Sequence, residues 1–212
     1  MKILLFATLL AVSNSVWAAP SVTSVMKTEN LGKPLKILGL GTPPETEYLI
    51  HSYQVNGCKV DVEVKNDLSK TIVALSIAAT SSCQSAQLSE VFKGQKIPNL
   101  TTLTFGQLTS VMGAARYTAD CLSLCGNAYD PSVYASWDVL VAEVVLVNGP
   151  AIDASMNWEK AIDSKYGEDY VVDNRFNCTQ EFDALAAQEF KNVKVTKLTL
   201  RQPSPKRECQ AK

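Results

Sequence analysis

Six cysteines constrain the fold of this 212-residue chain more than any other feature of its sequence. An even number of cysteines in an exported protein predicts three disulfides, and six residues allow several connectivities. Cys58 and Cys83 flank the first predicted hairpin, so we expect these two to pair with each other. The pairing of the other four stays open. The full set is Cys58, Cys83, Cys121, Cys125, Cys178 and Cys209.

Residues 1–18 have the features of a secretory signal segment. Lys2 provides a positive start, residues 3–12 are almost entirely apolar, and Val16-Trp17-Ala18 places small residues where a signal peptidase needs them. The alternative is an N-terminal membrane anchor, but the apolar run is shorter than the roughly 20 residues that span a bilayer. We therefore expect cleavage after Ala18, a periplasmic or secreted mature chain, and no membrane insertion afterwards.

The charge balance of the mature chain argues against polyanionic partners. Loss of Lys2 lowers the basic residues from 20 to 19, against 21 acidic residues, so the net charge is −2. Without a basic excess, we expect neither nucleic acid nor an anionic membrane as a partner. We divide the mature chain into an N-terminal arm (19–34), a single α+β domain (35–201, β-rich over 35–83 and mixed helical and strand over 84–201) and an irregular tail (202–212).

The clearest local pattern lies in Lys59–Lys65, where valines alternate strictly with charged residues. A period of two places Val60, Val62 and Val64 on a buried face and the charges in water. Residues 71–79 alternate in the same way, and the turn-forming Asn66–Ser69 lies between the two segments. The pattern predicts an antiparallel hairpin with one wet face. Further strands are expected at 35–40, 48–55, 139–147 (a central strand covered on both faces) and 193–200.

Helical periodicity appears after Cys83. Residues 151–166 place Ala154, Trp158 and Ile162 on one face of an amphipathic helix. Shorter helices are expected at 85–92, at 104–112 and from Asn177, where Gln180 would complete a capping box. The predicted fold class is α+β, an antiparallel sheet of short strands with helices packed on one side and braced by disulfides.

The stretch Asp120–Asp138 is the most unusual part of the sequence. Gly126 directly follows Cys125 and is expected to end a helix, while Asp130-Pro131 has the pattern of an N-cap that starts a second short helix. The result would be a cysteine-pinned corner that presents aromatic side chains for recognition. For Trp137 the competing interpretation is a core anchor. The candidate binding residues are Tyr129, Asp130, Tyr134 and Trp137.

Residues that could carry nucleophilic, metal or redox chemistry are few. His51 is the only histidine, so a Ser-His-Asp or Cys-His arrangement depends on one ring inside a predicted strand. No spacing of His and Cys suggests zinc, and no cofactor is expected. A redox role for Cys121 and Cys125 is disfavoured because the expected helix would end there, where the helix dipole opposes a thiolate. These features favour a protein that is not an enzyme.

Carboxylates offer the remaining catalytic option. Glu168, Asp169 and Asp173 cluster beside aromatic residues, as the acid pair of a polysaccharide hydrolase would. That hypothesis needs Asp130 or Asp138 within about 10 Å of Glu168 or Asp173. The preferred hypothesis is a periplasmic binding module, of the inhibitor or immunity type, whose partner is another exported protein. A carboxylate-dependent hydrolase acting on a cell-wall or other polysaccharide is the alternative, and no motif points to a named family.

Overall fold

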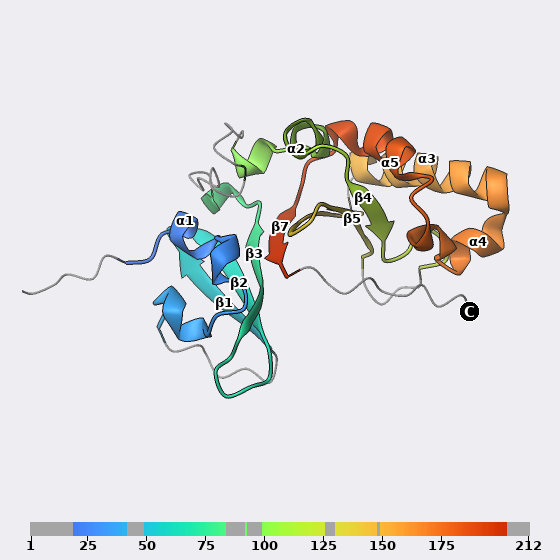
Figure 1. Cartoon of the computed structure of the whole chain (residues 1–212). Helices are drawn as coiled ribbons and strands as arrows, with labels where there is room; N and C mark the ends of the chain where they lie inside the picture. Colours follow the sequence, from blue (N-terminus) through green and yellow to red (C-terminus); the bar gives the residue numbers. More distant parts are fainter. Residues whose placement is uncertain are drawn as a thin grey trace, which may run out of the picture.

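Seven strands form one antiparallel sheet in the computed structural model, in the spatial order β1-β2-β3-β7-β6-β5-β4 (Figure 1). The structure describes residues 19–41, 49–83, 92, 99–125, 130–147 and 149–202. The strands are β1 (Ile50–Val55), β2 (Cys58–Val64), β3 (Ile72–Ala78), β4 (Arg116–Ala119), β5 (Ser132–Ser136), β6 (Leu140–Val145) and β7 (Lys197–Arg201).

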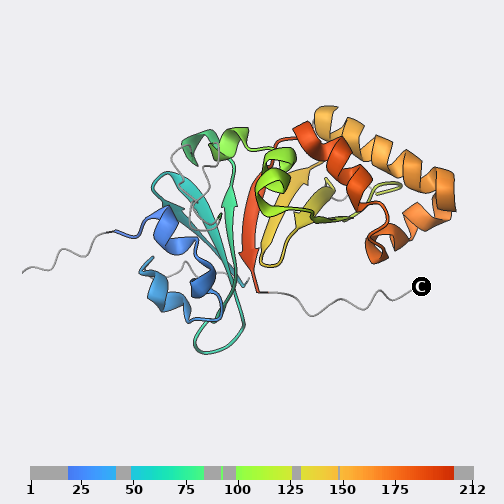
Figure 2. The same cartoon turned by 45° about the horizontal axis from the view of Figure 1, so that its top comes forward.

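Helices pack on one side of this sheet, as the sequence predicts. Figures 1 and 2 show α2, α3 and α5 grouped beside the β4–β7 part, and α1 with the first 3₁₀ helices beside β1–β3. The α-helices are α1 (Val22–Val25), α2 (Phe105–Met112), α3 (Gly149–Tyr166), α4 (Glu168–Val172) and α5 (Asp183–Glu189). The 3₁₀ helices are η1 (Thr28–Asn30), η2 (Leu35–Leu38), η3 (Ser81–Cys83), η4 (Leu100–Thr102), η5 (Arg175–Cys178) and η6 (Phe190–Asn192).

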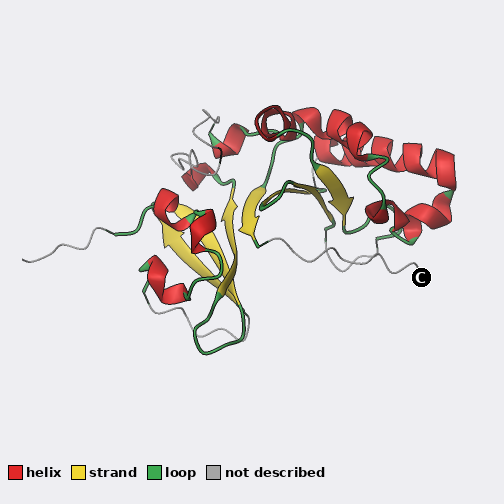
Figure 3. Ribbon diagram, in the orientation of Figure 1, coloured by secondary structure: helices red, strands yellow, loops and turns green. Residues whose placement is uncertain are grey.

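Strand β7 joins two blocks that are each consecutive in the chain, β1–β3 and β4–β6 (Figure 3). The register lines up one row of buried side chains across all seven strands, on the face that the helices cover. This inner face carries the core of the protein. The row runs through Tyr53, Val60, Ile77, Leu198, Ala142, Ala135 and Tyr117.

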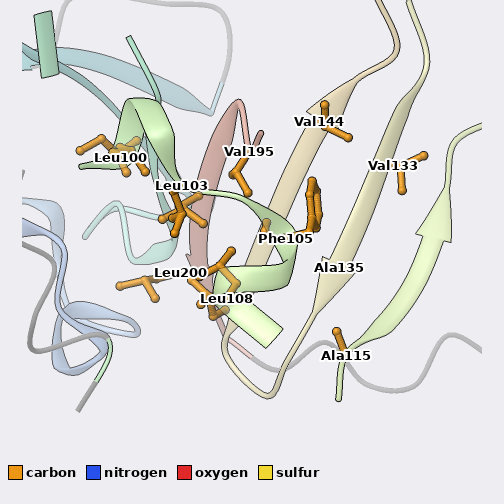
Figure 4. Close-up of a cluster of buried hydrophobic side chains, with 14 of the residues drawn as sticks. Leu100, Leu103, Phe105, Leu108, Ala115, Val133, Ala135, Val144, Val195 and Leu200 are labelled. Atoms are coloured by element: carbon orange, nitrogen blue, oxygen red, sulfur yellow. The ribbon is translucent and has the colours of Figure 1, made fainter. Parts of the chain in front are cut away.

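Apolar side chains of α2 and of Leu103, which directly follows η4, fill the space above the centre of the sheet. Figure 4 shows Leu103, Phe105 and Leu108 facing β7 and β6, near Leu200 and Val144. All five side chains are buried. This contact fixes α2 across the junction between the two blocks of strands.

An aromatic cluster holds α3 and η6 against β4. The Trp158 ring of α3 packs edge-on against Phe190 and Phe176, with centroids 6.2 and 5.3 Å away. The Tyr117 ring lies 6.2 Å from Phe105 and from Phe190. Burial raises the pKa of the Tyr117 hydroxyl to about 12.

Several local predictions are confirmed. Residues 59–65 and 71–79 form β2 and β3, with Val60, Val62, Val64, Leu75 and Ile77 inside and Val73 half-buried, and 104–112 and 151–166 form α2 and α3. The α+β fold braced by disulfides is confirmed as well. Asn56 and Gly57 both have positive φ, at 50° and 80°, so a tight two-residue turn joins β1 to β2.

Three predicted elements are wrong. Residues 35–40 form the 3₁₀ helix η2, because Leu35 and Leu38 reach the core from positions three apart and Gly39 then turns left-handed. Pro131 starts no helix; β5 follows it, since Val133 and Ala135 alternate into the core. The helix expected from Asn177 begins only at Asp183.

The central strand and the N-terminal arm also differ from expectation. Strand β6 is buried on one face, whereas Val141, Glu143 and Val145 are only half-buried on the other. The sequence sets the arm apart from the domain, but Val25 of α1 and the neighbouring Met26 are 1% and 2% exposed. This part of the chain therefore belongs to the core.

Two disulfides brace the described residues. Cys58 pairs with Cys83, as predicted, with their Cα atoms 4.4 Å apart. Cys121 pairs with Cys125 across four positions of sequence. Cys178 is also disulfide-bonded, and Cys209 lies outside the described residues.

Three expected segments lie wholly or mostly outside the part of the chain that the structure describes. The predicted signal segment and most of the predicted helix at 85–92 lie outside the described residues, as does the tail beyond Gln202. Among the helices that are described, none is long and apolar enough to cross a membrane.

Candidate functional site

The second face of the sheet, called here the outer face, carries polar side chains and no described helix. In the β4–β7 half, the register brings Lys197, Glu143, Tyr134 and Thr118 into one row of half-buried residues. Their neighbours on the same strands, one position up or down, point into the core. The alternation of the strands therefore places these polar groups together on this face.

Tyr134 is held in place through its hydroxyl group. The hydroxyl donates a hydrogen bond to Asp120 Oδ2 at 3.0 Å, and the backbone N–H of Ser132 donates to the same oxygen at 3.2 Å. Burial, the bond to Asp120 and the negative charge of Glu143 raise the pKa of Tyr134 well above its ordinary value. The hydroxyl stays protonated and fixed at any physiological pH.

Glu143 is the second centre of this cluster. One of its carboxylate oxygens accepts a hydrogen bond from Ser132 Oγ at 3.1 Å, and the other pairs with Lys197 Nζ at 2.6 Å. The Glu143 side chain is only 13% exposed, so its charge needs this partner. We call Asp120, Ser132, Tyr134, Glu143 and Lys197 the outer-face network.

The contacts of the outer-face network hold its side chains in fixed positions. Ser132 is 5% exposed and its hydroxyl donates to a carboxylate that Lys197 already neutralises, so nothing there removes its proton for attack on a substrate. Each charged group has its partner inside the network. The arrangement positions side chains and offers no activated nucleophile.

No protein family, curated protein or solved structure matches this chain. The function therefore has to be argued from the chemistry of the site itself.

The structure separates the predicted binding residues. Tyr134 belongs to the outer-face network, and Asp130 is exposed just before β5. Trp137 lies in the β5–β6 turn, packs against the core and donates from Nε1 to the carbonyl of Gly113 at 2.9 Å. The Trp137 side chain is therefore partly buried at the edge of the core. Tyr129 lies outside the described residues.

The cysteine corner differs from its predicted form. Residues 121–125 are not helical, and Leu124 has a positive φ of 53°. No helix ends at these described residues, so no helix dipole acts on Cys121 and Cys125. Gly126 itself lies outside the described residues. What the structure shows is that the Cys121–Cys125 bridge directly follows Asp120 of the outer-face network.

The predicted acid cluster has a different environment from a catalytic pair. Asp173 forms an ion pair with Arg175 at 2.8 Å, and Glu168 and Asp169 occupy the first turn of α4. Acids at a helix N-terminus are stabilised by the helix dipole and need no catalytic explanation. Within the described ranges, no group of three His, Cys, Asp or Glu side chains could hold a metal ion.

Asp120, Ser132, Glu143 and Lys197 were not among the candidate site residues predicted from the sequence. One signal was available: Glu143 is the only charge in the apolar run 139–147, and a lone charge in a strand marks the face that is not packed in the core. Ser132, Tyr134 and Ser136 also alternate with apolar residues. The contacts with Asp120 and Lys197 depend on strand order, which the local pattern does not contain.

Proposed function

We propose that the mature chain is an exported binding module of the inhibitor or immunity type, which contacts another exported protein through the outer face around Tyr134. The observation that carries the proposal is the outer-face network: a half-buried tyrosine, fixed through its hydroxyl, on a sheet face that no described helix covers. Tyrosine is among the residues that contribute most to protein interfaces.

The network also lowers the entropic cost of binding. Side chains that are flexible when free lose freedom on association, at roughly 0.5–1.5 kcal/mol each. Tyr134 and Lys197 are already held by Asp120 and Glu143, so a partner finds them in position. All five residues of β5 pair with β6 beneath them, which supports the same geometry.

Export of the chain is part of this proposal. Disulfides form and persist mainly in oxidising compartments. The described residues contain two of them, Cys58–Cys83 and Cys121–Cys125. The signal-like start of the sequence points the same way. An inhibitor or immunity protein that acts on an exported partner has to share its compartment.

The experiment immobilises the mature chain and two tyrosine variants of it and exposes each to an envelope extract. The retained partner protein is then compared between the variants. Tyr134 and Tyr166 both donate their hydroxyl to a carboxylate, Tyr134 on the outer face and Tyr166 to Glu181 at 2.7 Å among the helices. We expect Tyr134→Ala to lose a stoichiometric protein partner, with affinity reduced about 10- to 100-fold, since such a residue contributes about 1–3 kcal/mol.

Tyr166→Ala is the matched control and should retain the partner. Both variants must melt within a few degrees of the wild type for the comparison to count. Equal retention by both variants, or loss only with Tyr166→Ala, would place the interface elsewhere and refute the proposal for the outer face.

A further inference from the structure

The two edges of the sheet differ in how their outward-facing backbone groups are covered. An edge strand exposes alternate backbone N–H and C=O groups that can pair with another chain, and most proteins block them. Strands β1 and β4 are the edges of this sheet.

Side chains block the β4 edge. The N–H of Tyr117 donates to Asp183 Oδ1 at 3.0 Å. Asn177 bonds both backbone groups of Ala119, accepting from the N–H at 3.0 Å and donating to the carbonyl at 2.8 Å. Three outward-facing groups of β4 therefore have partners, the N–H of Tyr117 and both backbone groups of Ala119, and these contacts block the addition of a further strand.

The β1 edge carries no such caps among the described residues. The N–H of Val64 donates to the carbonyl of Leu49 at 2.8 Å, and the tight turn pairs Val55 with Cys58. Because bonded pairs alternate along an antiparallel ladder, Ile50, Ser52 and Gln54 direct their backbone groups away from β2. No described residue hydrogen-bonds to these outward groups.

The edge also lacks the features that normally prevent strand addition. Ile50, Ser52 and Gln54 are exposed and uncharged, and β1 contains no proline. Leu49 and Ile50 are 42% and 49% exposed, so the edge begins with unburied apolar surface. Lysine, proline or a bulge would be expected on an edge that must stay unpaired.

We propose that β1 pairs with β1 of a second copy of this chain, antiparallel and centred on Ser52, which joins the two sheets into one. In this register Ser52 faces Ser52 of the partner subunit, and Ile50 faces Gln54 of the partner subunit. It is the register in which all three outward-facing residues of each copy form bonded pairs. Direct edge-to-edge pairing therefore leaves none of their backbone groups unmatched.

The charges flanking this contact favour a second copy as the occupant. Glu63 lies beside Ile50 on β2, and Lys59 lies beside Gln54. Antiparallel pairing of two copies puts Glu63 of each copy in the same row as Lys59 of the partner subunit, so each row ends in opposite charges. The two copies of Asp61 stand about 14 Å apart, as far as Glu63 stands from Lys59 of the partner subunit, so physiological salt screens the attraction and the repulsion equally. Two rows of opposite charge stand against one row of like charge, and the small net attraction favours pairing of two copies.

The contact is small, so the dimer should be concentration-dependent. Stable interfaces bury about 1,600 Å² in total, and a single pair of edge strands buries less. Sedimentation velocity of the mature chain over a range of concentrations should show a reversible monomer–dimer equilibrium. Ser52→Pro should remove the dimer, because proline eliminates the central N–H while an outward-facing edge position tolerates it. Ser52→Thr keeps that N–H and should dimerise as the wild type does.

Cysteine crosslinking tests the register. Cα atoms of directly opposed residues in a bonded pair lie about 5.5 Å apart, within the range of a disulfide. Ser52→Cys should therefore form a crosslinked dimer under mild oxidation. Gln54→Cys is equally exposed on the same strand, but its two copies would stand about 15 Å apart and should crosslink far more slowly.

Three results would overturn the proposal: a wild type that stays monomeric at every concentration, a Ser52→Pro variant that dimerises normally, or equal crosslinking at both cysteine positions. If the wild type is monomeric, the β1 edge would instead be available to an extended strand of a different protein. Failure here leaves the proposed function untouched, because β5 with Tyr134 lies in the other half of the sheet.

Discussion

The side chain of Asn177 binds the backbone of Ala119 at both its N–H and its C=O, as a neighbouring strand would. The two bonds measure 3.0 and 2.8 Å and join residues 58 positions apart. Arg116, at the start of the same strand, donates to the carbonyls of Asn177 and Thr179 and pairs with Asp183. The segment between α4 and α5 is thus attached to β4 through side chains, and it seals that edge of the sheet.

Asn177→Ala should lower the free energy of unfolding by about 1–3 kcal/mol, because it leaves two partly buried backbone groups of Ala119 without partners. Urea denaturation measures the change. Gln180→Ala is the control: its side chain is exposed on the same segment, and the change should stay within about 0.5 kcal/mol. Equal losses of unfolding free energy in the two variants would show that the two bonds between Asn177 and Ala119 do not stabilise the fold.

Asp183 should make stability fall as pH rises. Burial raises its pKa above the ordinary 3.8, although the Tyr117 N–H and Arg116 oppose the shift. The folded state therefore binds the proton more tightly than the unfolded state, and the resulting stabilisation is complete below the unfolded pKa and lost as pH passes the folded pKa. The stability difference between wild type and Asp183→Asn should decline across this window. A difference that grows with pH would contradict the prediction.

The two disulfides should differ in their contribution. Cys58–Cys83 spans 25 residues and Cys121–Cys125 spans four. In the loop-entropy account, bridges of these spans contribute about 3.5 and about 2 kcal/mol. Replacing each pair by alanine should therefore destabilise the first variant more, by denaturant titration. The opposite order would show that strain or residual structure, not loop length, dominates.

Gly106 is required by a close approach of α2 to η6. A Cβ at this position would lie 2.6 Å from the backbone oxygen of Lys191. We expect Gly106→Ala to cost about 1–3 kcal/mol, as overpacking does. Gly149→Ala is the matched control, since nothing lies within 4 Å of its Cβ at the start of α3. A thermal melt in which both variants match the wild type would refute the argument.

Local patterns in the sequence determined the parts of the fold that depend on one element at a time. The valine alternation in β2 fixed which side chains face the core, because a strand has a period of two. The spacing of Trp158 and Ile162 fixed the buried face of α3 in the same way. The Cys58–Cys83 bridge followed from its position around one hairpin.

Only the tertiary structure decided the rest, because strand neighbours are set by packing over long distances in sequence. Asp130-Pro131 carries the local pattern of a helix start, yet pairing with β6 makes the next residues a strand. Strand β7 inserts between β3 and β6, and this brings Lys197 to Glu143 across 54 positions of sequence. The sequence could mark Glu143 as facing away from the core. The order of the strands decides that Lys197 lies beside Glu143 and neutralises its charge.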